Sequence, residues 1–133
     1  MGLVDFNDDD VLAAKLVKPD WYRVKILDVD ERISKKGTST NYFLTGKVIC
    51  ASDTGNTEFS GVPTPHWMFN TSPYAKRFMV GFFEALGVKV GSGTRVDMNS
   101  VKDKEIDVFI ENAVDVDGRM TNVIKDKYRA VRA

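Results

Sequence analysis

The feature that most limits how this chain can fold is an alternation of apolar residues that changes phase within one strand. In the segment 21–33 the apolar side chains share first one parity and then the other: Tyr22, Val24 and Ile26, followed by Leu27 and Val29. Alternation with a period of two predicts a strand with one buried face. A change of phase in mid-strand is typical of a bulge. We therefore expect this long first strand to serve two sheets of a small barrel.

Two further extended segments follow. Residues 34–41 form a basic loop with a glycine at its turn, and residues 42–51 alternate as a second strand. Residues 57–70 predict a third extended segment, which Pro63 and Pro65 interrupt. Because proline cannot donate to a ladder, we expect an edge position or a kink there, with pairing resumed from His66 to Phe69.

One helix is expected after the third segment. Ser72 or Thr71 supplies an N-cap, Pro73 suits the first helical position, and Gly87 ends the helix. Apolar residues recur at helical spacing on one face: Ala75, Phe78, Met79, Phe82 and Leu86. This stripe predicts core packing.

The chain closes with a hairpin. Residues 105–116 and 121–131 alternate as strands, and Asp117-Gly118 predicts a tight turn of the primed type between them. Three strands, a helix and two strands, with a long first strand, is the order of the five-stranded OB-fold barrel, which has its helix between strands 3 and 4. Without alternating strands and helices, a parallel sheet is not expected. A β-sandwich and an α+β open sheet stay open as alternatives.

Length and charge set the domain organisation. The chain has 133 residues with 19 Lys and Arg against 19 Asp and Glu, which suits one domain with one core. We assign residues 1–19 to an acidic N-terminal arm, in which Asp10 is expected to cap a short helical turn, and residues 20–133 to the barrel. The arm could compete with a polyanion for the basic surface. The acidic start does not suit a signal peptide and no apolar run could span a bilayer, so we expect a cytoplasmic protein without a membrane partner.

The residues offer little for catalysis. His66 is the only histidine, and its apolar neighbours predict a structural role. The consecutive carboxylates 8–10 lack the glycine and the distal glutamate of a calcium loop. Glu105, Asp107 and Glu111 could serve a metal-dependent nuclease, but no lysine follows them at a convincing spacing. We expect no enzyme, no metal and no cofactor, and keep the nuclease as an alternative.

Local charge and aromatic residues point instead to binding. Single-stranded nucleic acid needs cations for its phosphates and flat rings for its bases, with about 1–3 kcal/mol for each stacked base. In an OB barrel, strands 2 and 3 form the binding face, and the loops between strands 1–2 and 4–5 form its walls. Phe43 is preferred to Tyr42, which shares the parity of the core residue Leu44. The candidate nucleic-acid-binding residues are Lys35, Lys36, Phe43, Lys47, Trp67, Phe69, Lys125, Lys127 and Arg129.

Three stretches carry a resemblance to a known group: LVKPDWYRVKILDVDERISKKGTSTNYFLTGKVI, SPYAKRFMVGFFEALGV and GRMTNVIKDKYRAV. The first resembles the opening of small bacteriophage-encoded single-stranded DNA-binding proteins with an OB fold, in which Pro–x–x–Tyr leads into a strand, a lysine-rich turn with glycine and a second apolar strand. The helix lies where the group has its helix, and the last stretch is similar to its final strand, with Gly118, Arg119, Asn122, Ile124 and Tyr128 at the matching positions.

The resemblance spans residues 16–131 and implies a domain that coats single-stranded DNA in phage replication or recombination. It implies single-stranded DNA, and replication or recombination proteins, as partners. Many members end in an acidic tail that recruits partners, whereas this chain ends in the basic KDKYRAVRA. A homo-oligomer is compatible with the sequence. The alternative from another class is a structural or adaptor protein of a virion.

Overall fold

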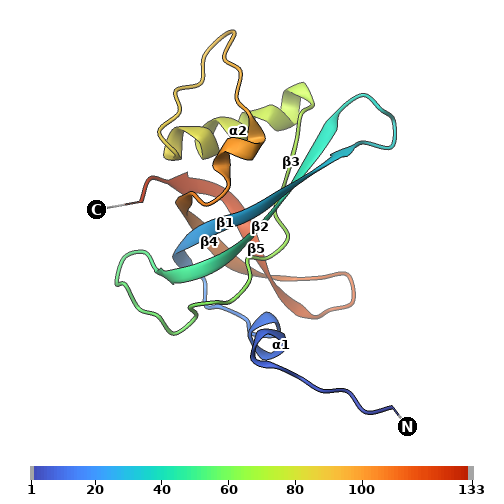
Figure 1. The fold of residues 1–133 in the computed structure, drawn as a ribbon, viewed down its shortest axis with the longest axis vertical. Helices are drawn as coiled ribbons and strands as arrows, with labels where there is room; N and C mark the ends of the chain where they lie inside the picture. The colour runs from blue at the N-terminus through green and yellow to red at the C-terminus, as the bar shows by residue number, and fades with distance from the viewer. Residues whose placement is uncertain (1, 132–133) are drawn as a thin grey trace.

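The first strand organises the sheet, as the computed structural model of residues 2–131 shows (Figure 1). Within these residues, antiparallel strands form one curled sheet in the order β3-β2-β1-β4-β5, an OB-like half-barrel with its main helix between β3 and β4. The elements are α1 (Asp8–Ala13), β1 (Asp20–Ile33), β2 (Thr40–Ala51), β3 (Met68–Asn70), α2 (Pro73–Ala85), the 3₁₀ helix η1 (Met98–Val101), β4 (Glu105–Val114) and β5 (Met120–Arg129). The predicted order of strands and helix is confirmed.

The phase change in β1 is a bulge. β1 pairs with β2 along its length and with β4 over its first half, from Asp20 to Lys25. The register to β2 shifts between Ile26 and Asp28, so that Leu27 has no partner in the ladder and lies exposed. Val29 then turns toward the core, against which it packs half-buried. One strand can therefore belong to both sides of the barrel.

The third extended segment follows β2 before it becomes a strand. Pro63 makes an isolated bridge to Lys47, and continuous pairing begins only at Met68. The Leu44 N–H donates to the Trp67 carbonyl at 2.9 Å just before β3 starts. β3 is a short edge strand, as the prolines predicted.

Helix α2 begins and ends where the sequence indicates. Ser72 is the N-cap residue, although its side chain makes no capping hydrogen bond, and Pro73 is the first helical residue. The helix ends at Ala85, and Gly87 has a φ of 86°, a conformation that glycine adopts without strain. α2 packs against both β3 and β5.

A cluster of rings fills the space between β3 and β5. Phe82 lies 4.9 Å from Phe69 and 5.4 Å from Tyr128, measured between ring centroids. The Trp67 indole stacks on Tyr128 at 6.2 Å, and its Nε1–H donates to the Tyr128 hydroxyl at 3.0 Å. Among residues 2–131 no ladder joins β3 to β5. Side chains therefore close the barrel where backbone pairing does not.

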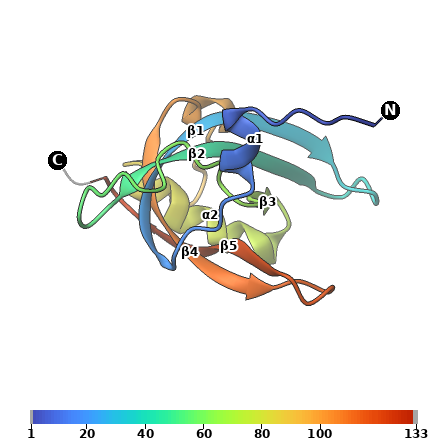
Figure 2. The same cartoon turned by 90° about the horizontal axis from the view of Figure 1, so that it is seen from below.

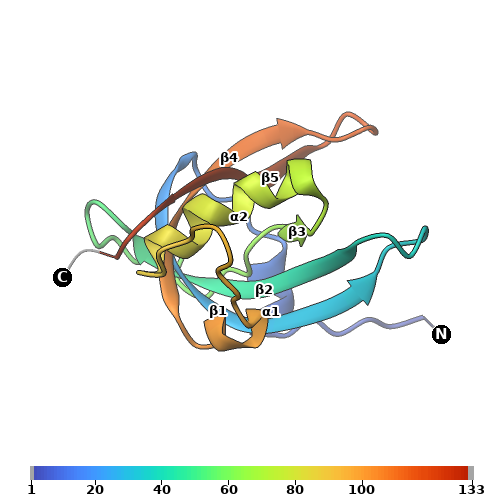
Figure 3. The same ribbon diagram turned by 90° about the horizontal axis from the view of Figure 1, so that it is seen from above.

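The two long hairpins project from the same side of the molecule, with β3 between them (Figure 2 and Figure 3). At the tip of β4–β5, the Gly118 N–H donates to the Asp115 carbonyl at 3.0 Å, and Gly118 has a φ of 80°. Asp117 does not share this left-handed conformation. The predicted primed turn is therefore wrong, because a type I turn followed by a left-handed glycine joins the strands instead.

The N-terminal segment has a part that projects from the barrel and a part that is held against it. Asn7, and not Asp10 as predicted, caps α1, and Asp10 completes a reciprocal capping box with it. Val17 is buried: its N–H donates to the Asn122 side-chain carbonyl at 2.9 Å, and the Asn122 side-chain NH₂ donates to the Val17 carbonyl at 3.1 Å. Residues 2–6 extend away from the barrel (Figure 1). None of the helices in the described part of the chain has the length and apolar content needed to cross a membrane.

Candidate nucleic-acid interface

Two predicted contact residues belong to the core. Trp67 is 4% exposed and Phe69 is 3% exposed, and both pack in the ring cluster between β3 and β5. Neither ring has a free face for a base, so the prediction that they stack on nucleic acid is wrong. The outward residues of this segment are their neighbours His66 and Met68, both of which are exposed.

Phe43 lies on the outward face, as predicted, within a group of cationic and aromatic side chains. The Arg32 guanidinium carbon is 5.2 Å from the centre of the Phe43 ring, and the His66 imidazole meets the ring edge-on at 5.8 Å. Met68 lies directly opposite Phe43 on β3. Phe43 is half-buried by these neighbours, which hold its ring in place. A fixed and partly open ring beside a guanidinium is suited to stacking on a base.

Further along β2 from this group, two lysines face each other across the sheet. Lys25 and Lys47 are directly opposite in the β1–β2 ladder. Glu105 lies opposite Lys25 on the other side, but the described residues include no carboxylate within ion-pair distance of either ammonium. Like charges directly opposite each other destabilise a sheet. A bound polyanion would remove this repulsion.

Two carboxylates in the second half of β1, Asp28 and Asp30, already have cationic partners. Asp30 accepts a hydrogen bond from the Arg32 Nε at 2.8 Å. The Lys102 ammonium lies 3.2 Å from Asp28, and its hydrogen bond holds the pKa of that carboxyl below the usual value. The local excess of charge is therefore positive, although the whole chain is neutral.

Lys35 and Lys36 occupy the exposed tip of the β1–β2 hairpin. The tip is closed by the Ser34 N–H, which donates to the Ser39 carbonyl at 2.9 Å, and by a left-handed glycine at Gly37. No carboxylate within the described residues forms an ion pair with either lysine. The tip is an exposed source of positive charge at one end of the face, and its role as a wall of the interface stays a prediction.

The cations of β5 differ in their availability. The Lys125 ammonium is 3.3 Å from Glu111. The Lys127 ammonium lies 5.5 Å from the centre of the Phe109 ring and is exposed. Arg129 is the least available, because its guanidinium already forms ion pairs with Asp53 and Asp107. We therefore assign Arg129 to the support of the sheet and not to phosphate binding.

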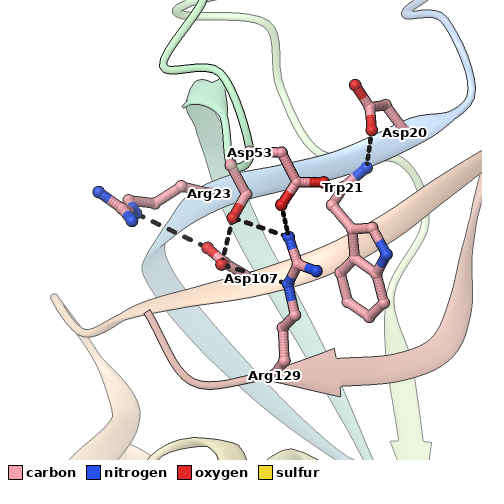
Figure 4. A network of polar contacts seen from close by, with 7 residues as sticks. Asp20, Trp21, Arg23, Asp53, Asp107 and Arg129 are labelled. Atoms are coloured by element: carbon pink, nitrogen blue, oxygen red, sulfur yellow. Dashed lines mark hydrogen bonds and ion pairs between the residues drawn. The ribbon is translucent and has the colours of Figure 1, made fainter. Parts of the chain in front are cut away.

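Arg129 belongs to an ionic network around Asp107, which is fully buried although it points to the outside of the barrel (Figure 4). The Asp107 carboxylate lies 3.6 Å from the Nε atoms of both Arg23 and Arg129. Ser52 donates its hydroxyl to the same carboxylate, and Arg129 also binds Asp53. The network ties β1, β4, β5 and the turn after β2 together. A buried carboxylate with two cationic partners is costly to disrupt.

Trp21 stands beside this network on the outward face. The Arg129 guanidinium carbon is 4.2 Å from the centre of its ring, and Phe109 meets the indole edge-on at 5.6 Å. The indole is half-buried, so part of its surface faces solvent. Arg129 on one side and Phe109 on the other hold it in place, as Arg32 and His66 hold Phe43.

These side chains lie on the outward face of the sheet, and cross-strand pairs and ring contacts link neighbouring members. We call this set the outer strip: Arg32, Phe43, His66, Lys47, Lys25, Arg23, Trp21, Phe109 and Lys127. Phe43, Lys47 and Lys127 are predicted by the sequence, whereas the other members of the strip are not. The alternation in residues 21–25 places Trp21, Arg23 and Lys25 on the polar parity, and this signal could have identified them. His66 was expected to be structural, but it is exposed beside Phe43.

Metal-ligand geometry and the comparisons with known proteins add two findings. Among residues 2–131, no three His, Cys, Asp or Glu side chains are grouped closely enough to hold a metal ion. No protein-family model matches the chain, and no curated protein is significantly similar to it. The functional assignment therefore depends on the side chains of the outer strip.

Proposed function

We propose that this chain binds single-stranded nucleic acid, with DNA as the expected ligand, along the outer strip of its OB-like barrel. One observation carries the proposal: the Phe43 ring lies on the outward face in contact with Arg32 and His66, and further along β2 Lys47 opposes Lys25, neither lysine having an ion-pair partner among the described residues. Stacking on the ring and neutralisation of phosphates by the lysines are the two interactions that sequence-independent binding requires.

The rest of the strip extends the same chemistry. Trp21 and Phe109 provide a second pair of rings, and Lys127 provides an exposed ammonium beside them. The resemblance to bacteriophage single-strand binders is in line with a role in phage DNA replication or recombination, in the cytoplasm of the host. Duplex DNA keeps its bases stacked inside, so the rings of the strip would have no partner there.

The test is a titration of labelled oligo-dT, a matched single-stranded RNA and a matched duplex, followed by fluorescence anisotropy at several salt concentrations. We expect binding to single strands that weakens as salt rises. Phe43→Ala should weaken binding by about 1–3 kcal/mol, which is roughly 5- to 150-fold in Kd, with an unchanged salt dependence. Lys25→Ala with Lys47→Ala should reduce the salt slope, by about 0.7 for each lost phosphate contact.

Tyr74→Ala is the matched control, because Tyr74 is an exposed ring on α2 outside the strip. It should leave the affinity for a short oligonucleotide unchanged. The absence of binding to oligo-dT at low salt would contradict the proposal, and so would equal affinity for duplex and single strand. Equal losses for Phe43→Ala and Tyr74→Ala would show that the strip is not the site.

A further inference from the structure

Within the N-terminal arm, residues 2–10 are exposed throughout and include three large apolar side chains close together. Leu3, Val4 and Phe6 are 84%, 71% and 76% exposed, and no other part of the described chain covers them. The four carboxylates of residues 2–10 accompany them without a single cation. Single exposed apolar residues are common on protein surfaces, but three within four positions on a projecting arm indicate an interaction site.

A pocket of about 490 Å³ lies at the other end of the molecule, between α2 and the loop 88–97. Its lining combines apolar side chains with two cations: Met79, Val80, Phe83, Val90, Lys76 and Arg77. Its size is that of a typical ligand pocket and would admit an aromatic side chain with an aliphatic neighbour. The lining itself has two cations and no carboxylate, and the segment 73–98 carries four cations against Glu84 and Asp97, so the net charge of this segment is opposite to that of the arm.

We infer that the arm of one copy docks into the α2 pocket of a second copy. The arm and α2 lie at opposite ends of the molecule, and α1 and Val17 hold the base of the arm against the barrel (Figure 1). An arm anchored there is directed away from the pocket of its own chain. Phe6 and Val4 enter the apolar part of the pocket, and Asp5 and Asp8 face Lys76 and Arg77.

Such a contact joins two different surfaces and is therefore heterologous. Heterologous contacts repeat from copy to copy and form a ring or an open filament. If the proposed function holds, a chain of copies would place successive outer strips along one nucleic-acid strand, and binding to long strands would be cooperative. The docking contact itself does not depend on the proposed function.

The first experiment measures the mass of the full chain by sedimentation velocity over a range of concentrations, without nucleic acid. We expect the mass to rise with concentration for the native chain. Phe6→Ser, and separately Lys76→Glu with Arg77→Glu, should weaken association by roughly tenfold or more. Val116→Ser, at a fully exposed position on the β4–β5 tip, is the control and should associate as the native chain does. Circular dichroism checks that each variant is folded.

A mixing experiment tests the head-to-tail geometry. The arm variant keeps an intact pocket and the pocket variant keeps an intact arm, so their mixture should form a dimer that grows no further. A native chain that stays monomeric at high concentration would overturn the inference, as would a mixture that stays monomeric. Association of Phe6→Ser equal to that of the native chain would also overturn it.

Nucleic acid separates this inference from the proposed function. Phe6→Ser should keep native affinity for an oligo-dT that covers one copy, and lose cooperativity on long poly-dT. Phe43→Ala should lose affinity for both. Loss of short-oligonucleotide binding in the Lys76→Glu, Arg77→Glu variant, with a native chain that is monomeric, would show that the pocket takes nucleic acid and would overturn the inference.

Discussion

At the scale of single residues, the ionisable side chains of β4 and β5 are divided between support and surface. Asp107 is fully buried on the outward side of the sheet because Arg23 and Arg129 cover it. Its charge is compensated by two guanidinium groups and by the Ser52 hydroxyl. Asp126 lacks such compensation. Partial desolvation raises the pKa of its carboxyl although the residue is exposed, and the nearby Lys125 lowers the pKa only in part.

The raised pKa of Asp126 predicts a pH dependence of stability. A carboxyl with a higher pKa in the folded state binds more protons there than in the unfolded state, so its contribution is favourable below the unfolded pKa, near 3.9, and is lost as the pH rises through the folded pKa. Asp126→Asn should therefore raise the urea midpoint at pH 7 by a small amount and leave it unchanged at pH 3. Asp28→Asn is the control with the opposite sign, because the pKa of Asp28 is lowered by Lys102. A lower midpoint for Asp126→Asn at pH 7 would contradict the prediction.

At the scale of elements, the contact between β3 and β5 is the part of the barrel that depends most on side chains. The Trp67 Nε1–H and the Tyr128 hydroxyl form the polar link within the ring cluster. Burial raises the pKa of Tyr128 well above its usual value, so the hydroxyl stays neutral at all ordinary pH values. One edge of the short β3 strand pairs with β2, and its β5 side is therefore held by ring packing with α2 and by this one hydrogen bond.

Removal of that hydroxyl should destabilise the domain. Tyr128→Phe leaves the buried indole N–H without its acceptor, which costs about 1–3 kcal/mol in the free energy of unfolding. Tyr42→Phe is the matched control, because the Tyr42 hydroxyl makes only a long 3.4 Å contact with Glu31 near the surface. Urea unfolding followed by tryptophan fluorescence measures both. Equal midpoints for Tyr128→Phe and the native chain would show that the link is dispensable.

At the scale of the whole molecule, the outer strip passes around the barrel from the β1–β2 hairpin to β5. Its two ring pairs lie on different parts of the curled sheet: Phe43 with His66 near β3, and Trp21 with Phe109 on β1 and β4. A strand that occupied the whole strip would pass both pairs. The fluorescence of Trp21 should therefore depend on the length of the bound oligonucleotide.

Tryptophan emission should report whether nucleic acid occupies the Trp21 end of the strip. Oligo-dT long enough to occupy the whole strip should quench Trp21, whereas the buried Trp67 should not respond. Trp21→Phe should abolish the quenching, and Trp67→Phe, as the control, should retain it. Quenching that survives Trp21→Phe would exclude Trp21 from the bound path, and anisotropy would show whether binding through Phe43 persists.

Local sequence signals determined most of the architecture. The phase change after Ile26 predicted the bulge, two prolines predicted the edge position of the third segment, and Ser72-Pro73 located the start of the helix. These features follow from the geometry of one residue and its neighbours, which is why no tertiary information was needed. The parity that placed Phe43 outside is a signal of the same kind.

The tertiary structure alone decided which rings and cations are free. In residues 66–69 both parities carry large side chains, so alternation could not tell whether Trp67 and Phe69 or His66 and Met68 face the core; packing of α2 and β5 on one side settles it. Arg129 looked like a phosphate ligand because its partners, Asp107 and Asp53, are distant in the sequence. The pairing of Lys25 with Lys47 depends in the same way on the register between strands. Contacts of this kind form only when the sheet curls, because curling determines which side chains meet.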